Sequence, residues 1–202
     1  TETVEDMEGI ALLSEKIAET YYDEDKRNHP SWCMIGTENS GLGGMRGRYL
    51  FGMEEKAGWW MRPYYSAPIE VGRLLRYTMT HDYVAGDFMW TGIDYLGEAH
   101  WPNRSANAGV LDTCGFAKDS FYFYQSIWRR DIPVAHLLPH WNIDVEQGTI
   151  LQVLGYTNCD SAELILNGKS YGKKAYSYPD YGMTQTYGHF DKEPIPANTP
   201  TT

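Results

Sequence analysis

The sequence has few cysteines, no long apolar run and no excess of basic residues, and each absence argues against a class of protein. Its three cysteines are far apart without Cys-x-x-Cys spacing, so neither a disulfide framework nor a zinc site is indicated. No run of about 18 apolar residues occurs, so we expect no membrane-spanning helix. The formal net charge of −10 argues against a basic surface that binds nucleic acid.

Aromatic residues, by contrast, are abundant. The chain of 202 residues contains seven tryptophans and 16 tyrosines, and 42% of its residues are hydrophobic. This composition is typical of a globular protein with a packed core rather than a disordered chain. The length is sufficient for one or two domains.

Residues 1–133 alternate strand-like apolar runs with segments of helical character. Residues 32–36 predict a fully buried strand, and residues 84–93 predict a second, apolar strand. Residues 70–81 place apolar side chains at helical spacing, and residues 116–130 predict another helix. Repeated strand–helix units whose strands do not alternate in polarity indicate a parallel sheet covered by helices.

Residues 134–202 have a different pattern of apolar and polar residues and form a second predicted domain. Residues 131–142 contain two prolines and are expected to be a linker. The segments 149–158 and 161–176 then alternate apolar and polar residues, and Asn167-Gly168 lies within the second. An Asn-Gly pair between alternating runs is a strong hairpin signal, so we expect antiparallel strands that begin a β-sandwich.

Carboxylates and aromatic residues follow both predicted strands of the first domain. Glu38 comes just after the first strand. A polar cluster follows the second strand: Asp94, Tyr95, Glu98, His100, Trp101 and Arg104. Because the carboxyl ends of parallel strands meet at one edge of a sheet, we expect these side chains to share one bowl. Aromatic rings beside carboxylates suit a sugar, although a lone glutamate after a strand is also often a surface residue or a helix cap.

Four motifs of the first domain resemble the β-galactosidases of glycoside hydrolase family 2, in the family's order. They are GTEN (36–39), DYVAGDFMWTGIDYLGE (82–98), WPNRS (101–105) and GVLDTCGFAKDSFYFYQSIW (109–128). The later ELILNGKSYGKK (163–174) resembles the β-sandwich that follows the barrel in many such enzymes.

The resemblance implies an α/β fold in two parts. Residues 1–133 would supply the C-terminal strand–helix units of a TIM (β/α)8 barrel. Residues 134–202 would supply the N-terminal part of an antiparallel, immunoglobulin-like β-sandwich.

The resemblance also implies roles for individual residues. Glu38 matches the nucleophile of a retaining glycosidase, which works with a second carboxyl group about 5 Å away. Trp90 matches the tryptophan that forms the floor under the sugar, with a core residue as the alternative. Asp94 is the candidate acceptor for sugar hydroxyls, and Glu98 and Arg104 are further candidate substrate contacts. Loop ordering is the alternative role for Asp94 and Glu98, and an ion pair with a nearby acid is the alternative for Arg104.

The chain departs from the family pattern in one chemical respect. The family's general acid is a glutamate preceded by asparagine on an earlier strand, and no such pair occurs here. Only about three of the eight strand–helix units are expected, so we interpret the chain as an internal segment of a larger enzyme, inactive by itself. Family members often use a metal ion, but no ligand set and no other cofactor can be assigned.

The resemblance implies a β-galactoside as the partner and neither nucleic acid nor a membrane, and it leaves room for a homo-oligomer. It fits a soluble bacterial protein, cytoplasmic or exported, with the compartment left open. The same scaffold also carries β-glucuronidase and β-mannosidase specificities, and a glucuronidase needs a cationic clamp for the substrate carboxylate. The candidate cations are Arg46, Arg48, Lys56, Arg62 and Arg104. A non-catalytic, carbohydrate-binding or structural role remains a third hypothesis.

The segment after Glu38 is rich in aromatic residues: Trp59, Trp60, Tyr64 and Tyr65. These side chains either form an outer subsite for further sugars or pack a large loop against itself.

Overall fold

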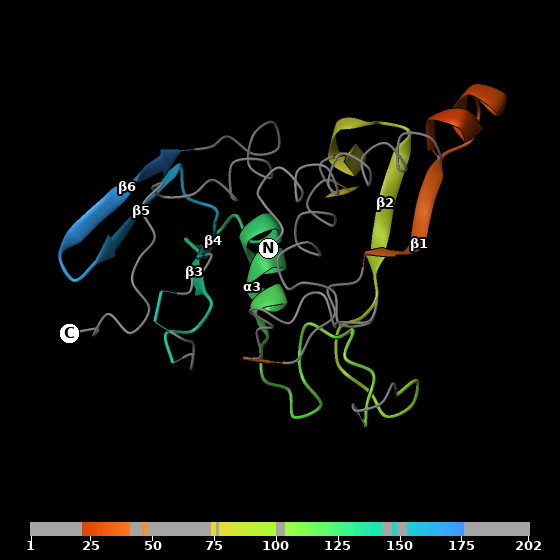
Figure 1. The fold of residues 1–202 in the computed structure, drawn as a ribbon. Coiled ribbons are helices and arrows are strands. Elements are labelled where there is room, and N and C mark those ends of the chain that lie inside the picture. The colour runs from red at the N-terminus through yellow and green to blue at the C-terminus, as the bar shows by residue number, and fades with distance from the viewer. Residues whose placement is uncertain are drawn as a thin grey trace. The chain divides into compact units, whose positions relative to one another are not determined.

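A computed structural model describes most of the middle of the chain (Figure 1). The residues it describes are 22–40, 46–47, 74–75, 77–99, 104–142, 147–148 and 153–175. The chain divides into two compact units, Thr1–Phe121 and Tyr122–Thr202. The division falls within α3, and the domain boundary expected near residue 133 stays a prediction.

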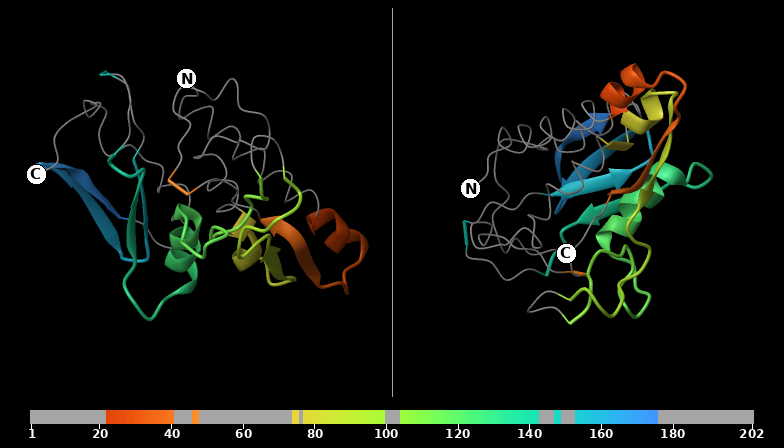
Figure 2. Two further views of the ribbon diagram at one scale, coloured as in Figure 1. Left: turned by 90° about the horizontal axis from the view of Figure 1, so that it is seen from below. Right: turned by 90° about the vertical axis from the view of Figure 1, so that its right-hand side faces the viewer.

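The first unit is built on a parallel pair of strands, β1 (Met34–Ser40) and β2 (Val84–Met89). The views in Figures 1 and 2 show the two strands side by side. Met34 pairs with Val84, and Ser40 pairs with Met89. The parallel arrangement predicted for this region is therefore confirmed for these two strands.

Both strand predictions for the first unit need correction in bounds and burial. β1 begins two residues later than expected and continues through Ser40, whereas β2 ends at Met89 rather than at residue 93. The full burial predicted for residues 32–36 was wrong, because Ile35 is 54% exposed. In the second, apolar strand, Phe88 is 61% exposed. Successive side chains of a strand point to opposite faces, and Met34 packs inward while Ile35 points the other way.

The core of the first unit joins the strands to two helical segments, residues 22–28 and 77–80. Met34, Tyr77 and Val84 form its buried centre, and the half-buried Tyr22 and Tyr83 pack against them. The helix expected over residues 70–81 is confirmed in its described part.

The prediction of which residues of the helix at 70–81 face the core was partly wrong. Leu75 is buried as expected, but Met79 is 52% exposed and the buried residue near it is Tyr77. A tyrosine can occupy this core position because its hydroxyl reaches Asp23, 2.8 Å away.

The second unit contains most of α3 (Asp119–Trp128) and the antiparallel strands β3 (Ala135–Leu138) and β4 (Leu154–Thr157). The helix packs on the strands through aromatic side chains. Phe123 meets the ring of Tyr156 edge-on at 5.4 Å between centroids, and Tyr122 stacks on His136 at 3.9 Å.

The linker prediction for residues 131–142 is wrong, because β3 lies within it. Its prolines misled the interpretation: Pro133 precedes the strand and Pro139 follows it, so neither removes a hydrogen bond from the ladder. Burial accounts for the strand, since Val134 is 5% exposed and Leu138 is fully buried.

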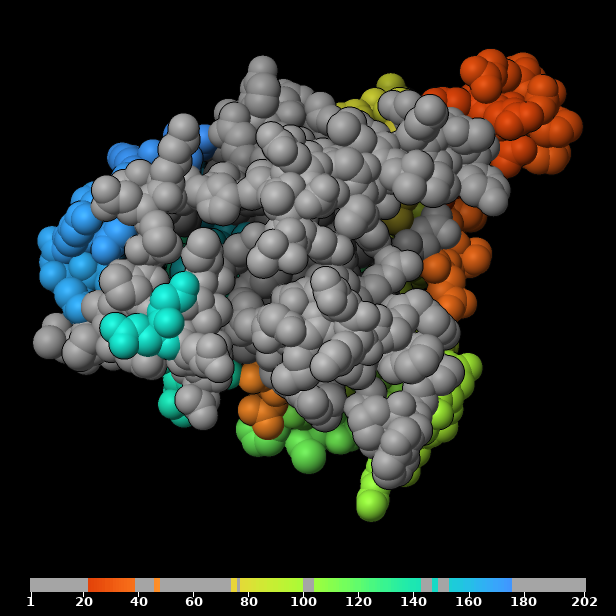
Figure 3. Space-filling model, in the orientation of Figure 1, coloured from red at the N-terminus to blue at the C-terminus, as the bar shows by residue number. Residues whose placement is uncertain are grey.

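A β-hairpin completes the second unit, formed by β5 (Ser161–Leu166) and β6 (Lys169–Ala175). Asn167 and Gly168 turn the chain with φ angles of 50° and 79°. Two successive positive φ angles characterise the type I′ turn, which confirms the hairpin predicted from the Asn-Gly pair. Figure 3 shows atoms of this hairpin at the molecular surface.

In the described segments, no helix is long and apolar enough to cross a membrane.

Candidate active site

Glu38 and Trp90 lie at the same edge of the β1–β2 pair. Glu38 lies within β1, two residues before the strand ends at Ser40. The sequence had placed it just past the strand. Trp90 follows directly after β2. Because Ser40 pairs with Met89 in a parallel register, the carboxyl ends of both strands, and with them these two residues, come to one edge.

The backbone around Glu38 is irregular. Gly36 pairs with Asp87 and Ser40 with Met89, so three residues of β1 face the single residue Phe88 of β2. Such bulges bend a strand and re-aim a side chain, and they are common beside active sites. The Glu38 side chain is exposed here rather than packed in the core.

Tyr95 connects the side chains at this edge. The indole Nε1 of Trp90 donates to the Tyr95 hydroxyl at 3.3 Å, and that hydroxyl donates to Glu98 Oε2. The two rings meet edge-on, with centroids 6.0 Å apart. The hydrogen bond to Glu98 raises the pKa of Tyr95, and the negative charges of Glu98 and Glu38 add to this shift. Glu38 therefore lies within electrostatic reach of this hydrogen-bonded group.

The loop that carries these side chains is tied to a second segment of backbone. Four hydrogen bonds of 2.9–3.2 Å join residues 91–94 to residues 108–111. The amide of Ala106 donates to the Tyr95 carbonyl at 2.9 Å and extends the contact. The loop after β2 is thus held along most of its length.

A buried ion pair lies under this loop. Lys118 Nζ is 2.7 Å from Asp94 Oδ1, and the two side chains are 5% and 9% exposed. The same carboxylate oxygen accepts the Gly109 amide at 2.9 Å, and Lys118 also donates to the Asn107 carbonyl at 3.2 Å. Burial lowers the pKa of Lys118, and the hydrogen bond and charge of Asp94 oppose that shift. These are loop-ordering contacts, and the substrate role of Asp94 stays a prediction.

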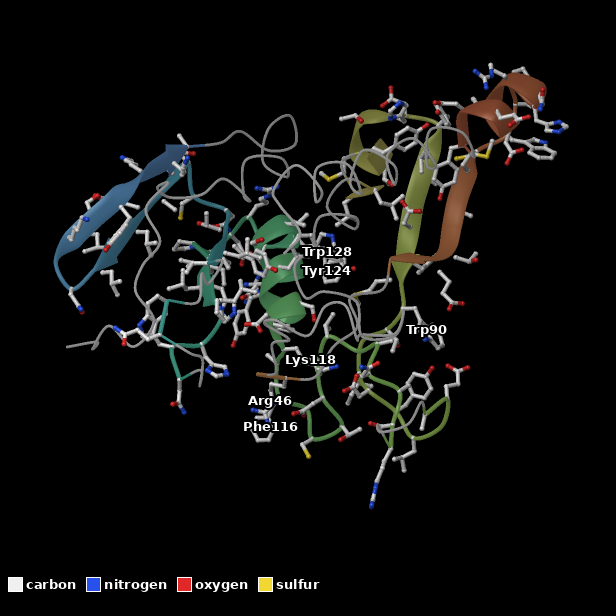
Figure 4. All side chains as sticks on the ribbon, in the orientation of Figure 1. Arg46, Trp90, Phe116, Lys118, Tyr124 and Trp128 are labelled. Carbon is white, nitrogen blue, oxygen red and sulfur yellow. The ribbon has the colours of Figure 1, made fainter. Side chains whose placement is uncertain are left out.

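A second ion pair engages one of the candidate cations. Arg46 Nε is 2.7 Å from Asp112 Oδ2, and the guanidinium lies 4.8 Å from the centre of the Phe116 ring. Figure 4 shows Arg46 and Phe116 side by side, with Lys118 and Trp90 labelled in the same view. The hydrogen bond from Arg46 lowers the pKa of Asp112, and the amides of Phe116 and Cys114 also donate to that carboxylate.

The structure joins two of the five residues singled out from the sequence, because Trp90 and Glu98 both hydrogen-bond to Tyr95. Glu38 lies at the same edge of the β1–β2 pair, whereas Asp94 points into the buried ion pair. Arg104 is exposed, and both of its alternative roles stay open. Other residues considered above lie outside the described part of the chain: Trp59, Trp60, Tyr64, Tyr65, His100 and Trp101.

Two residues of the site were given no role from the sequence. Tyr95 was named only as a member of the polar cluster after the second strand, and its hydrogen bonds to Trp90 and Glu98 appear only in the structure. Lys118 follows the apolar run Gly115–Ala117 and lies within the quoted motif of residues 109–128, but no sequence signal showed that it would be buried. Among the described residues, no three histidine, cysteine, aspartate or glutamate side chains are placed to hold a metal ion.

Known proteins share this combination of segments. The chain is 43% identical over 103 residues to a protein named Beta-galactosidase BoGH2A from Bacteroides ovatus. The aligned residues are 50% of this chain and 12% of that protein. The chain is similar to enzymes of glycoside hydrolase family 2. A second relative, named Putative beta-glucuronidase from Formosa agariphila, is 46% identical over 95 residues, which are 44% of this chain and 9% of the relative.

The fold agrees with solved structures of such enzymes. A β-glycosidase from Bacteroides vulgatus matches with a TM-score of 0.65 and 30% identity, over 77% of this chain and 24% of that one. Residues 140–190 match a family described as a domain of unknown function, DUF4982. This chain therefore spans about an eighth or less of the two sequence relatives and about a quarter of the structural one.

Proposed function

We propose that this chain carries the nucleophile of a retaining glycosidase that cleaves terminal β-galactosides. The observation that carries the proposal is the common edge of β1 and β2, where Glu38, Trp90 and Tyr95 gather. In this proposal residues 1–133 are part of a (β/α)8 barrel and residues 134–202 begin the β-sandwich that follows it.

The chemistry of this edge suits a double displacement. A carboxylate oxygen of Glu38 forms a bond to the anomeric carbon while the bond to the leaving oxygen breaks and a general acid protonates that oxygen. Water then releases the sugar and restores the carboxylate. The exposed Glu38 is accessible to a substrate, and Trp90, 43% exposed, offers a ring on which the apolar face of a pyranose can stack.

Cleavage of β-glucuronides is the second candidate function, because relatives on both the sequence and the structural side are named β-glucuronidases. That substrate needs a cation free to bind its carboxylate. Arg46 is already paired with Asp112, and Lys118 is paired with Asp94. Of the candidate cations that the structure describes, this leaves the exposed Arg104, and Arg48, Lys56 and Arg62 lie outside the described residues. We favour the galactoside because the four motifs of the first domain resemble β-galactosidases.

Covalent labelling of the full-length enzyme that contains this chain tests the proposal. The reagent is 2-deoxy-2-fluoro-β-galactosyl fluoride, which loses fluoride as Glu38 forms an ester with the anomeric carbon. We expect the intact mass to rise by one fluoroglycosyl unit, located on the peptide that contains Glu38. The corresponding glucuronyl fluoride, run in parallel, distinguishes the two specificities.

The Glu38→Gln variant should neither become labelled nor turn over substrate. Glu24→Gln makes the same chemical change at an exposed position of the helical segment 22–28 and should behave as the wild type. Labelling at another carboxylate, or wild-type turnover by Glu38→Gln, would overturn the assignment. Sugar binding by both variants without labelling of the wild type would favour a non-catalytic role.

A further inference from the structure

We propose that the buried Lys118–Asp94 pair is a positioning device that fixes the sugar-binding side chains of the loop after β2. The inference rests on the proposed function, because it concerns the reaction at Glu38. Neither side chain needs to touch the substrate in this reading. The pair acts through the backbone of the loop that carries Trp90, Tyr95 and Glu98.

The first step of the argument is the place of Asp94 in the chain. It lies between Trp90 and Tyr95, and its own amide donates to the Leu111 carbonyl at 2.9 Å. Its carboxylate is held from two sides, by the Gly109 amide at 2.9 Å and by Lys118 Nζ at 2.7 Å. A displacement of Asp94 therefore moves the adjacent Tyr95.

The second step is the reach of Lys118. Its amide donates to the Val110 carbonyl at 2.9 Å, and its ammonium group donates to the Asn107 carbonyl at 3.2 Å as well as to Asp94. Lys118 thus holds both the loop after β2 and the backbone segment against which that loop lies.

The third step is the cost of burying the two charges. A buried ion pair contributes little net stability, because each charge loses its hydration on burial. Breaking the pair by removing one partner leaves an uncompensated charge, which the structure accommodates only by moving or by admitting water. An ion pair buried beside a binding loop is therefore suited to holding one loop conformation, and that conformation sets where Trp90 and Tyr95 stand.

The consequence for the reaction is quantitative. Misplacement of a positioning group by about 1 Å costs about 100-fold in rate. We expect Lys118→Met and Asp94→Asn each to lower kcat by about that factor, with a much smaller change in KM. The double variant should be no worse than the worse single variant, because both changes disrupt the same pair. Lys118→Arg, which keeps the charge, should recover part of the activity.

The test uses the full-length enzyme and a set of aryl β-galactosides that each lack one sugar hydroxyl. If Asp94 bound a hydroxyl directly, the loss caused by Asp94→Asn would disappear for the substrate that lacks this hydroxyl. Positioning predicts the same fold loss for every substrate and for Lys118→Met. A loss confined to one deoxy substrate, or wild-type kcat in Lys118→Met, would overturn the inference.

The exposed pair Arg129–Asp131 supplies matched controls. Its atoms are also 2.7 Å apart, but the side chains are 50% and 63% exposed. Arg129→Met and Asp131→Asn make the same chemical changes as the test variants and should leave kcat unchanged. Equal losses in these controls would mean a general effect of charge removal and would overturn the inference.

Amide hydrogen exchange separates this inference from the proposed function. In Lys118→Met we expect faster exchange at the amides of Asp94, Ala106 and Leu111, and unchanged exchange in the β5–β6 hairpin. An inactive wild type that still showed this pattern would contradict the glycosidase assignment alone. An active wild type whose loop exchange and kcat are unaffected by Lys118→Met would contradict the positioning role alone. If Lys118→Met does not fold, Asp94→Asn and Lys118→Arg are subjected to the same measurements and decide the matter.

Discussion

Gly109 lies directly against the backbone of Asp94. A Cβ placed on Gly109 would lie 2.8 Å from the Ile93 Cα and closer still to the Asp94 amide nitrogen. Backbone atoms cannot move aside as the end of a side chain can. The absence of a side chain at residue 109 is therefore what allows the loop after β2 to approach its neighbour and place its amide on the Asp94 carboxylate.

Gly109→Ala should destabilise the protein by about 1–3 kcal/mol, the usual cost of overpacking a well-packed site. Denaturant unfolding of the full-length enzyme measures this difference. Gly92→Ala is the matched control in the same loop, because a Cβ there meets nothing within 4 Å. Equal stability of the two variants would contradict the close approach.

Tyr95→Phe should lower kcat/KM by about ten- to a hundredfold, because a hydrogen bond to a charged group such as the Glu98 carboxylate contributes about 1.5–3 kcal/mol. The substitution removes the hydroxyl that accepts from Trp90 and donates to Glu98, and it leaves the ring in place. Steady-state kinetics on an aryl β-galactoside provide the measurement. Tyr171→Phe, in the β5–β6 hairpin, should have no effect, and a similar loss in both variants would remove the special role of Tyr95.

Asp23 predicts a specific dependence of stability on pH. Burial raises the pKa of its carboxyl, but hydrogen bonds from Tyr83 and Tyr77 outweigh burial and leave the pKa below its ordinary value. A depressed folded-state pKa stabilises the protein fully above the unfolded-state pKa of about 3.9, and this contribution is lost as the pH falls through the folded-state pKa.

Urea unfolding between pH 6 and pH 2.5 checks this expectation. Asp23→Asn should be less stable than the wild type at pH 6, and the difference should shrink below about pH 4. Asp25→Asn, at an exposed position of the same helical segment, serves as the control and should run parallel to the wild type. A difference for Asp23→Asn that stays constant with pH would contradict the role of the carboxylate charge.

Gly168→Ala should destabilise the β5–β6 hairpin by about 1–2 kcal/mol, because φ at this position is 79° and a side chain strains this conformation. The melting temperature of the second unit within the full-length enzyme is the measurement. Gly155→Ala, within β4, is the control, since a Cβ there lies at an ordinary 4.0 Å from the His136 carbonyl. A loss as large for Gly155→Ala would show that the turn conformation is not the cause.

The sequence determined the features that depend on local chemistry. The Asn167-Gly168 turn followed from the rare ability of these residues to adopt positive φ. A helix was expected over residues 116–130, and α3 begins three residues later, at Asp119. The alternation of strands and helices indicated a parallel pair, and the four motifs quoted from residues 36–128 indicated the resemblance to glycoside hydrolase family 2. Each of these follows from residues that are close together in the chain.

Tertiary structure alone decided what depends on distant residues. β3 forms between two prolines because Val134 and Leu138 are buried, and no local pattern reports what will cover a segment. The sequence left Asp94 either a sugar-binding or a loop-ordering role, and only the structure shows that its carboxylate meets Lys118, 24 residues later in the chain. Whether a carboxylate faces a substrate or a buried ammonium group is set by the packing of separate segments, because solvation and partner distance, rather than residue type, determine where a charge is stable.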